Sequence, residues 1–354
     1  MDKLIKKAHQ IHLRYVLDSS PGIRRSRVGL PAGADKPAQA GQSFKYFDPN
    51  GVTIHNQNTL SRIKGLAIPP AWKDVWISPL EQGHLQATGF DKKGRKQYIY
   101  HADWRTLCEE DKFDSLIDFA ALLPQLRSRV NNLLRTSTLS KEKVLAAIVW
   151  LLEHTFIRVG NDEYARENQS FGLTTLRDRH VSIRGSNIKF EFMGKSGVFH
   201  LVKISHPTVA RTIKECSELP GYELFKCVDE DGVKHIIDSS DVNNFLQEIT
   251  GCEISAKDFR TWGGTVLAAS NLNSLGYFED RETEEKNISL VVKEVAKHLR
   301  NTPKVCRKYY IHPTVITTYS QKILVPHFQN KSAKKLDFMS KDEYKVLTLL
   351  QKYS

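Results

Sequence analysis

The sequence predicts an α+β protein, with a small β-rich N-terminal domain followed by a larger, mainly α-helical domain that contains a three-stranded sheet. Short segments of alternating apolar and polar residues, separated by Pro and Gly, fill positions 44–101. From position 104 onward apolar residues recur at helical spacing, with strand-like segments around 181–202. The chain has 354 residues, which favours two domains. We therefore expect domains over residues 1–103 and 104–354.

In the N-terminal part, residues 2–17 are predicted to form a short basic helix, and residues 18–43 a loop rich in Gly, Pro, Ala and Arg. The loop is either a simple surface connection or a basic arm for nucleic acid. Alternating segments predict strands around 52–54, 75–77 and 97–100, the last after a Gly94–Arg95 turn.

In the larger part, apolar residues from 144 to 156 have helical spacing, with Ser140 as the N-cap and Gly160 as the stop. Three strands are then expected, separated by turns at 185–187 and 194–197. This places Lys195 at the tip of the second hairpin.

Helices are expected to resume after Pro207, and one of them begins near Ser255. A further helix is predicted over 283–301, capped by Thr283 and stopped by Pro303.

Charge and cysteine content limit the class of protein. The formal net charge of +12 indicates either a polyanionic partner, such as nucleic acid, or a basic solvated surface. The five cysteines are odd in number and include no C-x-x-C pair, so neither a disulfide framework nor a zinc site is expected. The N-terminus lacks a signal-peptide core, and no apolar stretch approaches the ~20 residues of a membrane span. These features predict a cytoplasmic protein with reduced cysteines.

The turn at Gly194–Ser196 resembles the end of a phosphate-binding loop. That loop requires a glycine where this chain has Lys189, and a strand–turn–helix context instead of a hairpin, so nucleotide binding is excluded here. Lys195 is then either a solvated lysine or a donor that enters a groove of DNA.

Three further residues combine reactive chemistry with an ordinary structural alternative. Arg158 ends a strongly apolar helix and is either an ion-pair partner or a clamp for phosphate oxygens. Arg260 follows the predicted helix start and allows the same two interpretations. Tyr310 is one of 12 tyrosines and is by itself more typical of a core residue than of a nucleophile.

The order of these residues and their local sequences resemble the type IB DNA topoisomerases, and among them the bacterial enzymes similar to the poxvirus topoisomerase. The resemblance covers nearly the whole chain. The matching segments are Ile68–Trp72, Gly94–Tyr98, Arg158–Asn161, Gly172–Leu176, Gly194–Lys195, Lys257–Arg260 and Tyr310–Pro313.

The resemblance implies ATP-independent relaxation of supercoiled DNA through a 3′-phosphotyrosine intermediate. Tyr310 is then the nucleophile and Lys195 the general acid that protonates the leaving 5′ oxygen. Arg158 and Arg260 match the arginines that hold the non-bridging oxygens. No cofactor is expected, because the covalent link conserves the bond energy, and no metal site is expected either.

Two positions need separate consideration. Many relatives carry histidine nine residues before the tyrosine, where this chain has Asn301. The amide can make the same hydrogen bond without a protonated form, so we expect the contact to be kept and its pH dependence to be lost. Tyr309 is adjacent to Tyr310, but the Ile-His-Pro sequence that follows and the spacing to Asn301 favour Tyr310.

The same resemblance implies double-stranded DNA as the partner, bound by a monomer whose two domains form a C-shaped clamp, in the cytoplasm at the nucleoid. The expected DNA contacts are Gln97, Tyr98, Tyr100, Tyr164 and Lys257.

Two alternatives are a tyrosine recombinase and a non-catalytic DNA-binding protein. Recombinases usually have His-x-x-Arg where this chain has Lys257–Arg260, and a non-catalytic protein would not need the reactive side chains.

Overall fold

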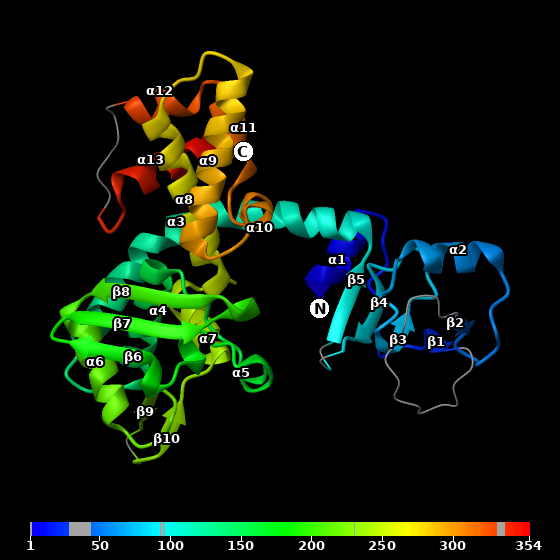
Figure 1. Cartoon of the computed structure of the whole chain (residues 1–354), viewed down its shortest axis with the longest axis horizontal. Helices are drawn as coiled ribbons and strands as arrows, with labels where there is room; N and C mark the ends of the chain where they lie inside the picture. The colour runs from blue at the N-terminus through cyan, green and yellow to red at the C-terminus, as the bar shows by residue number, and fades with distance from the viewer. Residues whose placement is uncertain (1, 28–43, 93, 95, 230, 331–336) are drawn as a thin grey trace. The chain divides into compact units, whose positions relative to one another are not determined.

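The computed structural model describes residues 2–27, 44–92, 94, 96–229, 231–330 and 337–354 (Figure 1). The chain divides into two compact units, residues 1–112 and 113–354. Each unit has its own hydrophobic core. No helix in the described part of the chain is long and apolar enough to span a membrane.

The first unit is built on a five-stranded antiparallel sheet with strand order β2-β1-β3-β4-β5. The sheet and helix α2 enclose a small core in which Ile63, Val75 and Ile77 are buried. The elements are α1 (Asp2–Gln10), β1 (Ile23–Arg27), β2 (Phe44–Phe47), α2 (Gln57–Gly65), β3 (Lys73–Ile77), β4 (Leu85–Phe90) and β5 (Lys96–Tyr100).

The structure corrects several expectations for this unit. Helix α1 ends at Gln10 and not at residue 17. Strand β1 lies inside the segment predicted as a loop, because Ile23 is buried and Arg25 donates to the carbonyl oxygens of Ile68, Pro69 and Trp72. The rest of that segment, residues 28–43, lies outside the described residues, as does Arg95 of the predicted turn.

The strand predicted around residues 52–54 is only an isolated bridge between Phe47 and Thr53. Asp48 explains this, because its carboxylate accepts from the backbone N–H groups of Asn50 and Val52 and turns the chain. Helix α2 and strand β4 were not predicted.

Strand β5 forms one edge of the sheet and carries the three residues expected to read DNA. The rings of Tyr98 and Tyr100 stack with centroids 6.0 Å apart, because alternate residues of a strand share one face. Gln97 belongs to the other face, and its amide donates to Asp91 at 3.1 Å. Tyr98 is 48% exposed.

The second unit is mainly helical. Helix α3 enters it from the first unit, and helices α8 and α9 run side by side in its upper part (Figure 1). The elements are α3 (Ala102–Leu134), α4 (Lys141–Thr155), α5 (Asp162–Asn168), β6 (Val181–Arg184), β7 (Asn187–Met193), β8 (Phe199–Ser205), α6 (Pro207–Glu218), β9 (Lys226–Val228), β10 (Lys234–Ile236), α7 (Ser239–Thr250), α8 (Ala256–Leu275), α9 (Arg281–Leu299), α10 (Pro303–Tyr309), α11 (Pro313–Ser320), α12 (Leu324–Gln329) and α13 (Lys341–Tyr353). Within the described residues this unit also has three short 3₁₀ turns, Leu173–Thr175, Asp178–His180 and Lys195–Gly197.

Helix α4 forms the centre of the core, and most of its side chains are buried. The predicted N-cap is confirmed, because the Ser140 hydroxyl accepts from the backbone N–H of Lys143 at 3.3 Å. The predicted stop at Gly160 is wrong. The helix ends at Thr155, because Phe156 has a left-handed backbone with φ of 52°.

The predicted three-stranded meander is confirmed as the antiparallel sheet β6-β7-β8. Its inner face buries Ile188, Phe190 and Phe192 against the core, as the alternation in the sequence requires. The turn between β7 and β8 is Lys195–Gly197, so Lys195 lies at the predicted hairpin tip.

The ends of the later helices are partly as predicted. Ser255 is the N-cap position of α8, as expected. Asp280 and not Thr283 caps α9, because its carboxylate accepts from the backbone N–H of Thr283 at 2.7 Å. Helix α9 ends at Leu299 and Pro303 begins α10, because proline is well suited to the first turn of a helix.

Candidate active site

Arg260 is the best-buried cation of the predicted set, with a residue exposure of 3%. It lies in the second turn of α8 and donates to the carbonyl oxygen of Phe156 through Nη1 and to that of Leu299 through Nη2, the latter at 2.7 Å. Both carbonyls belong to helix ends, where backbone oxygens lack partners within the helix. Arg260 therefore ties the ends of α4 and α9 to α8.

Burial lowers the pKa of Arg260 to about 10, and the positive charge of Arg158 contributes in the same direction. Contact with Tyr310 partly opposes this lowering. The guanidinium is a cation at neutral pH even so, and two arginines that line one cavity form a site that attracts an anion.

Arg158 follows the end of α4 and is half-buried. Its Nη2 donates to Oδ1 of Asn301 at 2.9 Å. Asn301 follows the left-handed residue Arg300, which ends α9 with φ of 49°. The turn after α9 thus brings the amide to the arginine.

Tyr310 stands directly after α10, and its backbone N–H donates to the carbonyl oxygen of Cys306 at 2.9 Å. The guanidinium carbon of Arg260 lies 5.2 Å from the centroid of the Tyr310 ring. Gly264 makes this approach possible, because a Cβ atom there would lie 2.5 Å from the carbonyl oxygen of Tyr310.

Cys306 offers a second nucleophile in the same region, but its environment opposes that role. Burial raises the pKa of its thiol to about 11, although Arg260 and Arg158 partly offset this effect. The thiol is therefore protonated at neutral pH and unreactive.

A cavity of about 300 Å³ joins these residues. Lys195 and Lys257 lie on its wall, and both are exposed. Its full lining is Ile157, Arg158, Val159, Gly160, Asn161, Ser170, Phe171, Gly172, Lys195, His200, Ala256, Lys257, Arg260 and Tyr310. Four of the five predicted catalytic residues therefore share one cavity, and the fifth, Asn301, contacts Arg158.

His200 and Gly264 are two residues of the site that the sequence analysis missed and that bear on its chemistry. His200 lines the cavity and is buried. The sequence could have indicated His200, because the predicted meander pairs it with Phe192 and so places it on the inner face of the sheet. Nothing in the local sequence distinguishes Gly264 from an ordinary helix glycine.

The remaining predicted residues lie elsewhere. Tyr309 is 37% exposed, has Lys308 over its ring and is absent from the cavity lining. Tyr164 belongs to α5, but its side chain lies outside the described residues. Gln97, Tyr98 and Tyr100 belong to the first unit.

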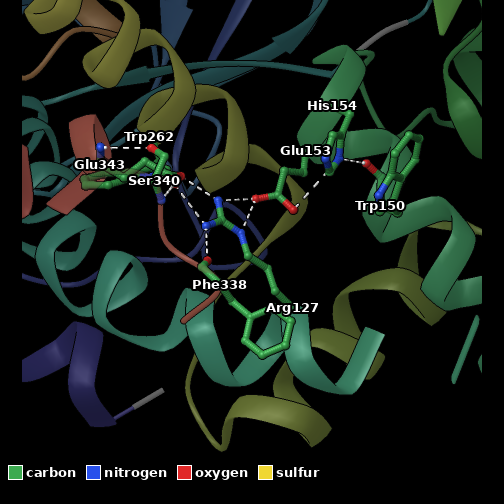
Figure 2. A network of polar contacts seen from close by, with 8 residues as sticks. All are labelled: Arg127, Trp150, Glu153, His154, Trp262, Phe338, Ser340 and Glu343. Carbon is green, nitrogen blue, oxygen red and sulfur yellow. Dashed lines mark hydrogen bonds and ion pairs between the residues drawn. The ribbon is translucent and has the colours of Figure 1, made fainter. Parts of the chain in front are cut away.

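A network of charges centred on Arg127 packs against the helices that carry the site (Figure 2). Arg127 donates from Nε to Glu153 of α4 at 2.6 Å and from Nη1 to Glu343 of α13 at 3.0 Å. Glu343 also accepts from the indole N–H of Trp262 on α8, two residues beyond Arg260, at 3.1 Å. The network therefore connects α13 to α4 and to α8, the helix that carries Arg260.

Comparison with known proteins identifies the family. The catalytic core of eukaryotic DNA topoisomerase I matches residues 101–336, and the N-terminal domain of bacterial DNA topoisomerase IB matches residues 43–91. The chain belongs to the type IB DNA topoisomerases. A DNA topoisomerase 1B of Acanthamoeba polyphaga mimivirus is 32% identical over 305 residues, covering 84% of this chain and 89% of the relative. The DNA topoisomerase 1B of vaccinia virus strain Copenhagen is 24% identical over 256 residues, covering 71% and 77%.

Membership of the type IB topoisomerases makes the protein an isomerase whose substrate is DNA and whose activity is relaxation of supercoiled DNA. The recombinase and non-catalytic alternatives are thereby set aside. The formal net charge of +12 favours binding of a polyanionic substrate.

Proposed function

We propose that Tyr310, Arg158, Arg260, Lys195 and Asn301 are the catalytic residues of this relaxation reaction. The observation that carries the proposal is the shared cavity, in which the Tyr310 ring lies beside Arg260 and which Lys195, on its hairpin tip, also lines. A scissile phosphate in this cavity would meet a nucleophile, two cations and a proton donor.

In the first step the phenolic oxygen of Tyr310 attacks the phosphorus and gives up its proton to solvent. The bond between phosphorus and the 5′ oxygen breaks, and Lys195 donates a proton to that oxygen. Arg158, Arg260 and the amide of Asn301 bind the non-bridging oxygens, whose charge grows in the transition state. Reversal of these steps reseals the strand.

The covalent phosphotyrosine retains the energy of the broken phosphodiester. Rotation of the free strand about the intact one then releases supercoils, and resealing requires no ATP. The arginines supply the positive charge that metal ions provide in other phosphoryl-transfer sites, so we propose that no metal is obligatory.

We further propose that residues 1–103 and 104–354 act as two domains of a C-shaped clamp, and that a monomer binds duplex DNA at the nucleoid in the cytoplasm. The exposed Tyr98 and the half-buried Tyr100 share one face of an edge strand, which suits contact with a groove. Gln97 would have to leave Asp91 to reach a base. Tyr164 and Lys257 are proposed to contact DNA near the cleaved phosphate.

The test is relaxation of a negatively supercoiled plasmid in excess chelator, without ATP. The wild-type chain is expected to relax it fully, and Tyr310→Phe is expected to leave it supercoiled while still binding duplex DNA. Absence of relaxation by the wild type, or a strict requirement for Mg²⁺, would contradict the proposal.

A further inference from the structure

His200 is a buried imidazole that makes no hydrogen bond to any described residue. Its exposure is 3%, and both Nδ1 and Nε2 lack partners in the described part of the chain. Buried polar groups are almost always paired, so two unpaired nitrogens on one ring require an explanation. The ring lies on the wall of the cavity that contains Lys195, Arg158, Arg260 and Tyr310.

The position of the imidazole is fixed by the hairpin that carries Lys195. His200 of β8 is the register partner of Phe192 of β7, and the two rings stack with centroids 4.7 Å apart and planes inclined by 24°. Nε2 faces the start of the hairpin turn, because a Cβ atom on Gly194 would lie only 2.5 Å from it. The residue after Gly194 is Lys195, so this nitrogen faces the turn that bears the proposed proton donor.

The surroundings keep the imidazole neutral. Burial lowers the pKa of His200 to about 4, and the positive charges of Arg300, Arg158 and Arg260 act in the same direction. Arg300 is held beside the strand by its hydrogen bond to the carbonyl oxygen of Leu201 at 2.8 Å. At neutral pH the ring therefore has one N–H group and one free lone pair.

A neutral acceptor suits the site because the side chains that line the cavity, all among the described residues, include no carboxylate. A carboxylate would bind Lys195 tightly and repel the phosphate. An imidazole lone pair can direct an ammonium group while leaving the net charge of the cavity positive.

We propose, on the basis of the proposed role of Lys195 as proton donor, that His200 is a positioning residue for that lysine. Nε2 accepts a hydrogen bond from the Lys195 ammonium when DNA is bound and directs another of its protons toward the leaving 5′ oxygen. The reacting bonds do not change. The proton still passes from Lys195 to the oxygen, and His200 remains neutral throughout.

The test compares His200→Phe, His200→Gln and Lys195→Ala in single-turnover cleavage of two DNA duplexes. One duplex has the natural 5′ oxygen at the cleavage site, and the other has a bridging 5′ sulfur. A thiol leaving group has a pKa of about 8.5 and leaves without general-acid assistance. Phenylalanine keeps the stacking on Phe192 and removes both nitrogens, whereas glutamine can return an amide oxygen near Nε2.

We expect His200→Phe to slow cleavage of the oxygen substrate by about 10- to 100-fold, which is less than the ~10²- to 10⁴-fold contribution of a general acid, because Lys195 itself is still present. On the sulfur substrate its rate should recover to within about threefold of wild type, as should that of Lys195→Ala. His200→Gln should recover part of the rate on oxygen. Thermal unfolding midpoints and duplex affinity should stay at wild-type values.

Three results would overturn the proposal. The first is a wild-type rate for His200→Phe on the oxygen substrate. The second is rescue by sulfur in Lys195→Ala but not in His200→Phe, which would reject the role of His200 and keep that of Lys195. The third is absence of rescue in Lys195→Ala, which would reject the proton donor itself. If His200→Phe fails to fold, His200→Leu, which also removes both nitrogens, replaces it on the two substrates and is judged by the same outcomes.

Discussion

Arg158 donates from Nη2 to Oδ1 of Asn301 at 2.9 Å, which joins segments 143 positions apart in the chain. The bond fixes which end of the amide faces the arginine. Nδ2 of Asn301 is left buried and without a hydrogen-bond partner among the described residues. An unpaired buried donor on an amide that is bound to Arg158 is suited to bind an anionic oxygen.

The first prediction concerns this amide. Asn301→Ala should reduce single-turnover cleavage about 100-fold, because one donor to the phosphate is lost. Asn301→His should restore cleavage and add a pH dependence near the histidine pKa of about 6.5, with faster cleavage on the acidic side. The wild-type rate should show no step there from residue 301. An unchanged rate in Asn301→Ala would remove Asn301 from the catalytic set.

The second prediction separates the adjacent tyrosines. Tyr310 lines the cavity beside Arg260, whereas Tyr309 is exposed with Lys308 over its ring. Tyr310→Phe should abolish the covalent protein–DNA adduct trapped by denaturant, and Tyr309→Phe should retain it. An adduct formed by Tyr310→Phe and lost in Tyr309→Phe would reverse the assignment.

The third prediction concerns Gly264. A Cβ atom at this position would lie 2.5 Å from the Tyr310 carbonyl oxygen and 3.1 Å from the side chain of Leu299. Gly264→Ala should therefore displace the Tyr310 backbone and reduce cleavage at least about 10-fold, because small misplacements of a reacting group are costly. Binding to duplex DNA should change far less.

Gly65→Ala is the matched control, because a Cβ atom there meets nothing within 4 Å. Its cleavage rate should equal that of the wild type. Equal rates for both variants would show that the contact between α8 and Tyr310 is not what places the nucleophile.

Local patterns were sufficient to predict some features of this molecule. The helix cap at Ser140 was predicted correctly, and so was the alternation of buried and exposed side chains at residues 188–192. Both features depend only on residues that are neighbours in the sequence. Strand β1 was missed because Arg25 is satisfied by carbonyl groups more than 40 positions away. His200 was missed for a related reason. Its interest comes from two ring nitrogens that lack hydrogen-bond partners among the described residues, and only the tertiary structure shows this.

The same distinction applies to the site. The types and order of its residues could be read from the sequence through resemblance to relatives. Its assembly could not, because Arg260 binds the ends of two helices that only the tertiary fold brings together. Tertiary context also changed the ends of helices α4 and α9, where left-handed Phe156 and Arg300 stop the helices before the predicted residues.

The last prediction concerns the charge network around Arg127. Burial alone would raise the pKa of Glu343, but the hydrogen bond and charge of Arg127 outweigh it, and the net pKa is lowered. A carboxyl group with a lowered folded-state pKa stabilises the fold fully above its unfolded value of about 4.3, and this stabilisation is lost as the pH falls through the folded value. The network should therefore weaken below about pH 4.

Glu343→Gln tests this, because it keeps the shape and removes the charge. The Glu343 side chain is only 12% exposed, so breaking the pair should cost about 3 kcal/mol at neutral pH. The loss of stability on acidification should also be shallower than in the wild type. Urea unfolding at neutral pH and at about pH 4 measures both effects.

Glu282→Gln is the control for this measurement, because Glu282 pairs with Lys286 on the surface and is 78% exposed. Its effect should not exceed about 0.5 kcal/mol. If Glu343→Gln and Glu282→Gln destabilise the protein equally, or if both have the acid sensitivity of the wild type, the Arg127 network does not hold α13 to α4 and α8.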